Sequence, residues 1–147
     1  MTQPHDPRTF DEQVRDLCGK DPRFPRGAYE FCFEVLDFTL KAVAERDDPE
    51  RRRPVTRHVS ARELLEGLRD YALQEFGPMA RLTLKRMGVA SCGDFGDIVF
   101  NLVNTGLLAK QPRDKREDFN NGYDFEEAFG KPFRPAPTRK PNKRNPP

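Results

Sequence analysis

The sequence has few cysteines and histidines, and no pattern joins them into a site. Its three cysteines, Cys18, Cys32 and Cys92, are an odd set without a C-x-x-C pair. Small secreted domains held together by disulfides do not have this pattern, so we expect reduced thiols. With only His5 and His58 besides, the chain lacks the usual Cys and His ligands of structural zinc. We therefore predict no metal site and no cofactor.

Long apolar runs are also missing. The charge-free stretch Val99–Ala109 contains two asparagines and is far shorter than the ~20 apolar residues that span a membrane. The first residues, Met1–Arg8, do not show the charged start and apolar stretch of a secretory signal. We expect a cytoplasmic protein that does not enter the membrane.

Positive charge is concentrated at the C-terminal end. Of the 26 basic and 24 acidic residues, six basic and no acidic ones lie in residues 131–147, which leaves residues 1–130 with a net charge of −4. The same segment holds six prolines and only Phe133 as a large apolar residue. It cannot bury enough apolar surface to offset its ordering entropy, so we predict a disordered basic tail. A disordered start at residues 1–8 then leaves one domain, residues 9–130.

Apolar residues repeat at helical spacing through most of this domain. Ser60 and Glu63 form a capping-box pattern just before one of these repeats, and Ser91 and Asp94 do the same before another. Gly93 and Gly96 lie near the start of that last helix. Glycine inside a helix costs about 1 kcal/mol relative to alanine, so we expect another part of the chain to approach the backbone closely at both positions. The repeats predict five helices, at about Thr9–Cys18, Pro25–Arg46, Ala61–Phe76, Pro78–Met87 and Cys92–Thr105.

The residues after the last helix suggest a small β-hairpin. Leu107–Lys110 and Asp118–Phe125 are candidate strands, and Asn121-Gly122 is typical of a tight turn. A final helical turn at Asp124–Phe129 would attach Phe125 and Phe129 to the domain. The predicted fold is mainly α: a compact domain of about five helices with a small C-terminal hairpin, similar in order to a winged-helix domain.

Several short runs resemble a widespread family of small bacterial proteins that has no assigned activity. The resemblance covers roughly residues 10–130 and implies the domain limits, but it adds no site residue. The runs that carry it are Ala28-Tyr29-Glu30-Phe31, residues 58–67 (HVSARELLEG), Phe76-Gly77-Pro78, residues 94–100 (DFGDIVF), Gly106-Leu107-Leu108 and Tyr123-Asp124-Phe125.

Basic residues outside the last helix could contact nucleic acid. In a winged-helix domain the helix at Cys92–Thr105 would read DNA, but it carries Asp94 and Asp97 and no lysine or arginine, which argues against that role. The alternative is that these basic clusters are solvated faces, balanced in part by nearby acids. The candidate phosphate contacts are Arg81, Lys85 and Arg86 before that helix, Arg113, Lys115 and Arg116 in the expected wing, and Arg139, Lys140, Lys143 and Arg144 in the tail.

These features favour a non-enzymatic binding module that associates with RNA or a ribonucleoprotein such as the ribosome. One alternative is a protein–protein adaptor whose tail serves solubility, with the aromatic residues between Phe119 and Phe133 as an anchor. A second alternative is a small enzyme that uses Cys92 as nucleophile and His58 as base, because the start of a helix can lower the pKa of a thiol.

Overall fold

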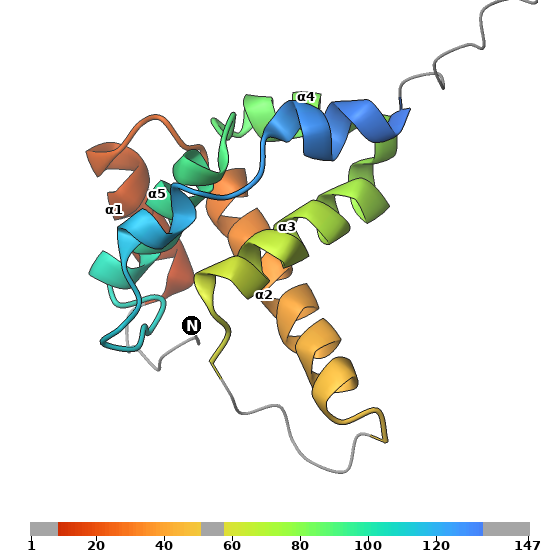
Figure 1. Cartoon of the computed structure of the whole chain (residues 1–147). Helices are drawn as coiled ribbons and strands as arrows, with labels where there is room; N and C mark the ends of the chain where they lie inside the picture. The colour runs from red at the N-terminus through yellow and green to blue at the C-terminus, as the bar shows by residue number, and fades with distance from the viewer. Residues whose placement is uncertain (1–8, 51–57, 134–147) are drawn as a thin grey trace, which may run out of the picture.

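A computed structural model describes residues 9–50 and 58–133. Within these ranges the protein is mainly helical, as predicted, with short helical turns between and after five α-helices (Figure 1). The helices are α1 (Phe10–Lys20), α2 (Arg26–Asp47), α3 (Ala61–Phe76), α4 (Ala80–Arg86) and α5 (Cys92–Asn104), and the turns are η1 (Gly77–Met79), η2 (Arg116–Phe119), η3 (Glu126–Gly130) and η4 (Lys131–Phe133).

Helices α2 and α3 cross at the centre of the fold and share its largest helix–helix contact (Figure 1). The crossing is close because Gly67 of α3 has no side chain: a Cβ atom there would lie 1.8 Å from Oγ1 of Thr39 on α2. The Thr39 hydroxyl is buried and donates to the carbonyl of Val35 at 2.7 Å, so its polar group is satisfied within α2.

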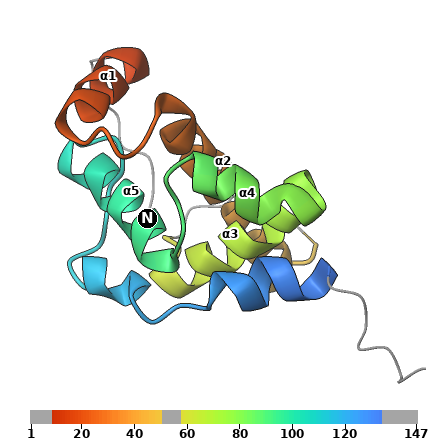
Figure 2. The ribbon, with the colours of Figure 1, turned by 90° about the horizontal axis from the view of Figure 1, so that it is seen from above.

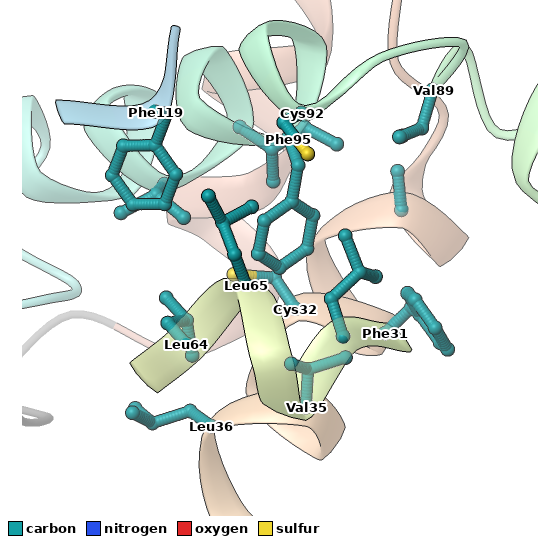
Figure 3. Close-up of a cluster of buried hydrophobic side chains, with 14 of the residues drawn as sticks. Phe31, Cys32, Val35, Leu36, Leu64, Leu65, Val89, Cys92, Phe95 and Phe119 are labelled. Atoms are coloured by element: carbon teal, nitrogen blue, oxygen red, sulfur yellow. The ribbon is translucent and has the colours of Figure 1, made fainter. Parts of the chain in front are cut away.

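The core is a single apolar cluster between these two helices and α5. Phe95 of α5 is fully buried, and its ring points from α5 toward the side chains of α2 and α3 (Figure 3). The side chains around it come from the faces that helical periodicity predicts to be buried. They include Phe31, Cys32, Val35 and Leu36 on α2, and Leu64 and Leu65 on α3.

The predicted starts of α3 and α5 are confirmed, whereas α4 begins at Ala80 and the predicted first residue, Pro78, lies in η1. Ser60 Oγ accepts from the Glu63 backbone N–H at 3.1 Å, and the Glu63 carboxylate accepts from the Ser60 N–H at 3.0 Å, which completes the capping box of α3. At α5, Ser91 Oγ accepts from the Asp94 N–H at 3.1 Å, but the Asp94 carboxylate accepts from the Ala90 N–H, so only half of the predicted capping box forms. Gly106 follows the end of α5 with φ +85°, a conformation that glycine adopts without strain.

The predicted β-hairpin is wrong. Within residues 58–133 there is no strand, apart from an isolated bridge residue at Ala109. Leu107 and Leu108 are both buried, so this segment lacks the alternation of a half-exposed strand. Gly122 is not among the glycines with positive φ, although a tight hairpin turn of the Asn-Gly type requires that conformation.

Phe119 explains why the chain turns helical where a strand was expected. Its side chain is fully buried, and its ring lies 6.5 Å from that of Phe95 and 6.2 Å from that of Phe100, centroid to centroid. The 3-10 turn η2 places Phe119 directly on α5, over Gly96. Tertiary burial of one aromatic ring has therefore overridden the local turn signal.

The predicted final helical turn is confirmed and is longer than expected. Turns η3 and η4 run beside α4 and α3 (Figure 2). Phe125 and Phe129 are both buried, with ring centroids 4.9 Å apart in an edge-to-face arrangement. Lys131–Phe133, which the sequence placed in the tail, forms η4.

Residues 1–8, 51–57 and 134–147 lie outside the described part of the chain, and with them the predicted disordered termini, most of the tail, and the loop arginines at 51–53. Among the helices that are described, none is both long and apolar enough to cross a membrane.

Candidate binding surface

A groove of about 530 Å³ lies between α4 and the C-terminal turns η3 and η4. Its volume falls within the ~300–1,000 Å³ that is typical of ligand sites. The groove combines apolar walls with a basic edge. Leu82, Val89, Phe129 and Phe133 form the apolar lining, and the side chains of Arg81 and Lys85 lie along the edge.

Large apolar side chains are exposed beside this groove. Leu82 on α4 and Phe133 on η4 are each 43% exposed, and Met79 on the neighbouring turn η1 is 53% exposed. In the described part of the chain these are the large hydrophobic side chains that stand out from the surface. Exposed apolar groups gathered in one region are typical of binding surfaces.

The α4 side of this surface carries no acid, because residues 77–93 contain no aspartate or glutamate, and on the facing turn η3 Glu127 is paired with Lys131. Arg81 is neutralised, since its guanidinium pairs with the carboxylate of Glu126 on η3. Lys85 and Arg86 are exposed and form no ion pair with any described residue. Two of the three basic residues predicted on this helix are therefore available to an outside anion.

The second predicted basic cluster does not join the first. Arg113 lines a different, shallower hollow with Asp114 and Glu117, where positive and negative groups alternate. Both views place η2 on the α1 and α5 side of the molecule, away from α4 (Figures 1 and 2). Lys115 is exposed and pairs with no acid among the described residues, whereas the Arg116 guanidinium is held by Asp97 and donates to Asn120 at 2.7 Å. Arg116 therefore has a structural role.

The polar face of α5 is also used inside the fold. Asp97 pairs with Arg116 and, at 3.2 Å, with Arg23 in the loop between α1 and α2. Asn101 donates to Asp21 at 3.0 Å and to the Tyr29 hydroxyl at 3.2 Å. Asp97 and Asn101 are thus already bonded to protein, which agrees with the argument against a DNA-reading role for this helix, although Asn104 at its end is exposed.

The loop carboxylate of this network is strongly stabilised in its charged form. Arg23 binds Asp21 at 2.7 Å, and this contact, with the hydrogen bond from Asn101, holds the pKa of Asp21 well below its ordinary value of 3.8. The sequence showed Asp97 only as a negative charge on a helix without lysine or arginine. Its ion pairs involve residues 74 and 19 positions away, so no local pattern could have shown them.

Cys92 does not have the environment of a nucleophile. The thiol is buried at the start of α5 and donates to the carbonyl of Tyr123 at 3.4 Å. Burial raises the pKa of Cys92, the opposite of the shift that a reactive thiolate needs. Within residues 9–50 and 58–133 no group of three potential metal ligands is found.

The basic residues Arg139, Lys140, Lys143 and Arg144 lie outside the described residues. The last described residue, Phe133, lines the groove, so the chain continues into the basic segment from this surface. The structure thereby connects the α4 cations with the start of the tail, although the two are 45 or more residues apart in sequence.

No protein-family model, curated protein or solved structure matches the chain. The resemblance to an uncharacterised bacterial family therefore stays a prediction.

Proposed function

We propose that this protein is a non-enzymatic, cytoplasmic binding module that associates with RNA or a ribonucleoprotein. The observation that carries the proposal is the position of Lys85 and Arg86. They are exposed cations on an element without acids, beside the point from which the basic C-terminal segment begins. Lys85 and Arg86 thus expose positive charge on a domain, residues 1–130, whose net charge is −4.

RNA suits such a surface because its phosphates recur along the strand and release counterions when cations replace them. Lysine and arginine side chains in this arrangement position a backbone and do not read bases. Lys85 and Arg86 supply the contacts from the folded body, and Arg139, Lys140, Lys143 and Arg144 supply those from the tail. Arg113 and Lys115 form a separate and weaker set, and Arg81 and Arg116 are excluded by their ion pairs.

The proposal is tested by measuring RNA affinity against salt concentration for the full-length chain. Replacing Arg139, Lys140, Lys143 and Arg144 by glutamine should reduce the slope of log affinity against log salt by about three, since each single-strand phosphate contact contributes ~0.7. The matched control replaces Arg15, Lys20, Lys41 and Arg62, which lie on α1, α2 and α3. If both variants change the slope equally, only net charge matters and the proposed surface is wrong.

A protein–protein adaptor is the second candidate, and the exposed side chains of Met79, Leu82 and Phe133 favour it. Purification from the native cells with and without nuclease separates the two candidates. Nuclease should release the bound macromolecules if RNA is the main ligand. Partners that stay bound after nuclease and are lost on Leu82→Asp would support the adaptor instead.

A further inference from the structure

The groove beside α4 offers two kinds of contact within one small area. Lys85 provides a free positive charge at its edge, and Phe133 presents a ring that is 43% exposed. Phe129, which is buried, forms the base on which the C-terminal turns pack. A ligand that uses both contacts must carry negative charge and also present a flat or apolar group a short distance away.

Single-stranded RNA meets both requirements. Its phosphates match the free lysine, and its unpaired bases can stack on an aromatic side chain. In duplex RNA the phosphates are equally available, but the bases are stacked on one another and cannot enter a groove in the protein.

We propose that the groove between α4 and η4 receives an unpaired base of RNA, stacked on Phe133, so that the protein prefers single-stranded to duplex RNA. This inference rests on the proposed RNA-binding function and names the form of RNA that the surface selects. The arrangement assigns Lys85 to an adjacent phosphate and Leu82 to an apolar wall beside the base.

An acidic peptide with an apolar anchor is the competing ligand for such a groove. The charge distribution favours RNA, because the chain leaves the groove after Phe133 into a segment with five basic residues and no acid, while Lys131 before it is paired with Glu127. A long, regularly charged strand can contact these cations in succession while one of its bases occupies the groove. A short peptide anchor would use the groove and leave the tail unused.

The absence of tryptophan from the chain allows a direct test. Phe133→Trp introduces the only indole of the protein, at the position where stacking is proposed. Oligouridine should quench its fluorescence on binding, and an adenine–uridine duplex of the same length should not. Oligouridine should also bind the wild-type chain at least about ten-fold more tightly than the duplex does.

A second set of full-length variants separates stacking from general apolar contact. Phe133→Leu keeps an apolar side chain without an aromatic face and should weaken oligouridine binding about ten-fold, while duplex binding stays unchanged. Lys85→Gln should weaken the binding of both RNAs, and Lys20→Gln on the distant helix α1 should affect neither. Circular dichroism of each variant confirms that it is folded.

The outcomes distinguish this inference from the function on which it rests. Equal affinity for both RNAs, with no quenching, overturns base insertion and leaves electrostatic RNA binding in place. If neither oligouridine nor the duplex binds at low salt, both this inference and the proposed RNA-binding function are wrong. If a glutamate- and leucine-rich peptide quenches the indole and oligouridine does not displace it, the groove is a peptide site and the inference is wrong.

Discussion

Two glycines occupy the first turn of α5 in different surroundings. At Gly96 a Cβ atom would lie 2.6 Å from Cβ of Phe119, and neither backbone can move without disturbing the core. At Gly93 the nearest outside atom to such a Cβ is Nη2 of Arg116 at 3.3 Å, the end of a flexible side chain. The sequence marks both glycines as costly in a helix, but only the structure shows that Gly96 is sterically required.

Gly96→Ala should lower the free energy of unfolding by about 1–3 kcal/mol, because the added methyl group overpacks the contact with Phe119. Gly93→Ala is the matched control and should be neutral or raise it by up to about 1 kcal/mol, through the better helix propensity of alanine. Urea unfolding of both variants measures the difference. Equal stability of the two would contradict the packing described for η2 on α5.

The cysteines should differ in reactivity according to their burial. Cys32 is fully buried, which raises its pKa to about 12, and burial also raises the pKa of Cys92. Cys18 is only partly buried. In the native protein at pH 8 a thiol reagent should therefore label Cys18 first and Cys32 and Cys92 slowly. In denaturant the reagent should label all three cysteines at the same rate. If Cys92 is labelled rapidly in the native protein, and is still labelled rapidly in the Cys18→Ser variant, the result would support the hypothesis of an enzyme that uses Cys92.

At the scale of elements, local signals account for most of what the chain does. The capping boxes, the helical repeats and the stop at Gly77-Pro78 act within a few residues, so the five helices could be predicted from sequence. The hairpin prediction failed because Phe119, Tyr123 and Phe129 pack as aromatic contacts on α5 and on one another, and this favours helical turns.

The loop between α1 and α2 is tied to α5 by charge, which gives the fold a predictable response to acid. The pKa of Asp21 is lowered in the folded state, so the unfolded chain binds a proton at a higher pH than the native one does. The contribution of Asp21 to the free energy of unfolding is therefore complete at pH values above 3.8, the ordinary pKa of an aspartate. It is lost as the pH falls below that value.

Asp21→Asn should accordingly be less stable than wild type at pH 7, and the difference should shrink between about pH 4 and pH 2. Asp70→Asn removes an exposed carboxylate that pairs with its neighbour Arg69, and it serves as the control with little effect at either pH. Thermal unfolding across this range provides the measurement. A pH-independent difference for Asp21→Asn would mean that the network contributes through packing and not through charge.

For the whole molecule, the structure divides the basic residues into two groups with different tasks. Arg81 and Arg116 connect elements distant in sequence, through Glu126 and Asp97 respectively. Lys85 and Arg86 connect nothing within the described residues and face outward. The amino-acid sequence does not distinguish these two groups, because it does not show which acids will fold back beside each basic residue.

This division predicts that binding and stability can be separated by mutation. Arg116→Gln should lower the free energy of unfolding by about 1 kcal/mol, since it leaves a half-buried carboxylate with one partner fewer, and should not change RNA affinity at temperatures where the variant is folded. Lys85→Gln should leave stability within about 0.5 kcal/mol and weaken RNA binding. Urea unfolding measures the stability of each variant, and RNA titration of the same samples measures its affinity. If Arg116→Gln weakens RNA binding and Lys85→Gln does not, the surface around Lys85 is not the RNA-binding surface.

Local sequence accounts for the helices, the serines that cap α3 and α5, the faces the helices bury and the uneven distribution of charge, because each depends on residues a few positions apart or on composition. Packing between distant segments accounts for the helical turns η2 and η4, the two arginines bound by Asp97, and the groove that α4 and Phe133 border. These features join residues separated by tens of positions. Their energies come from contacts that exist only when the helices pack, so no local pattern encodes them.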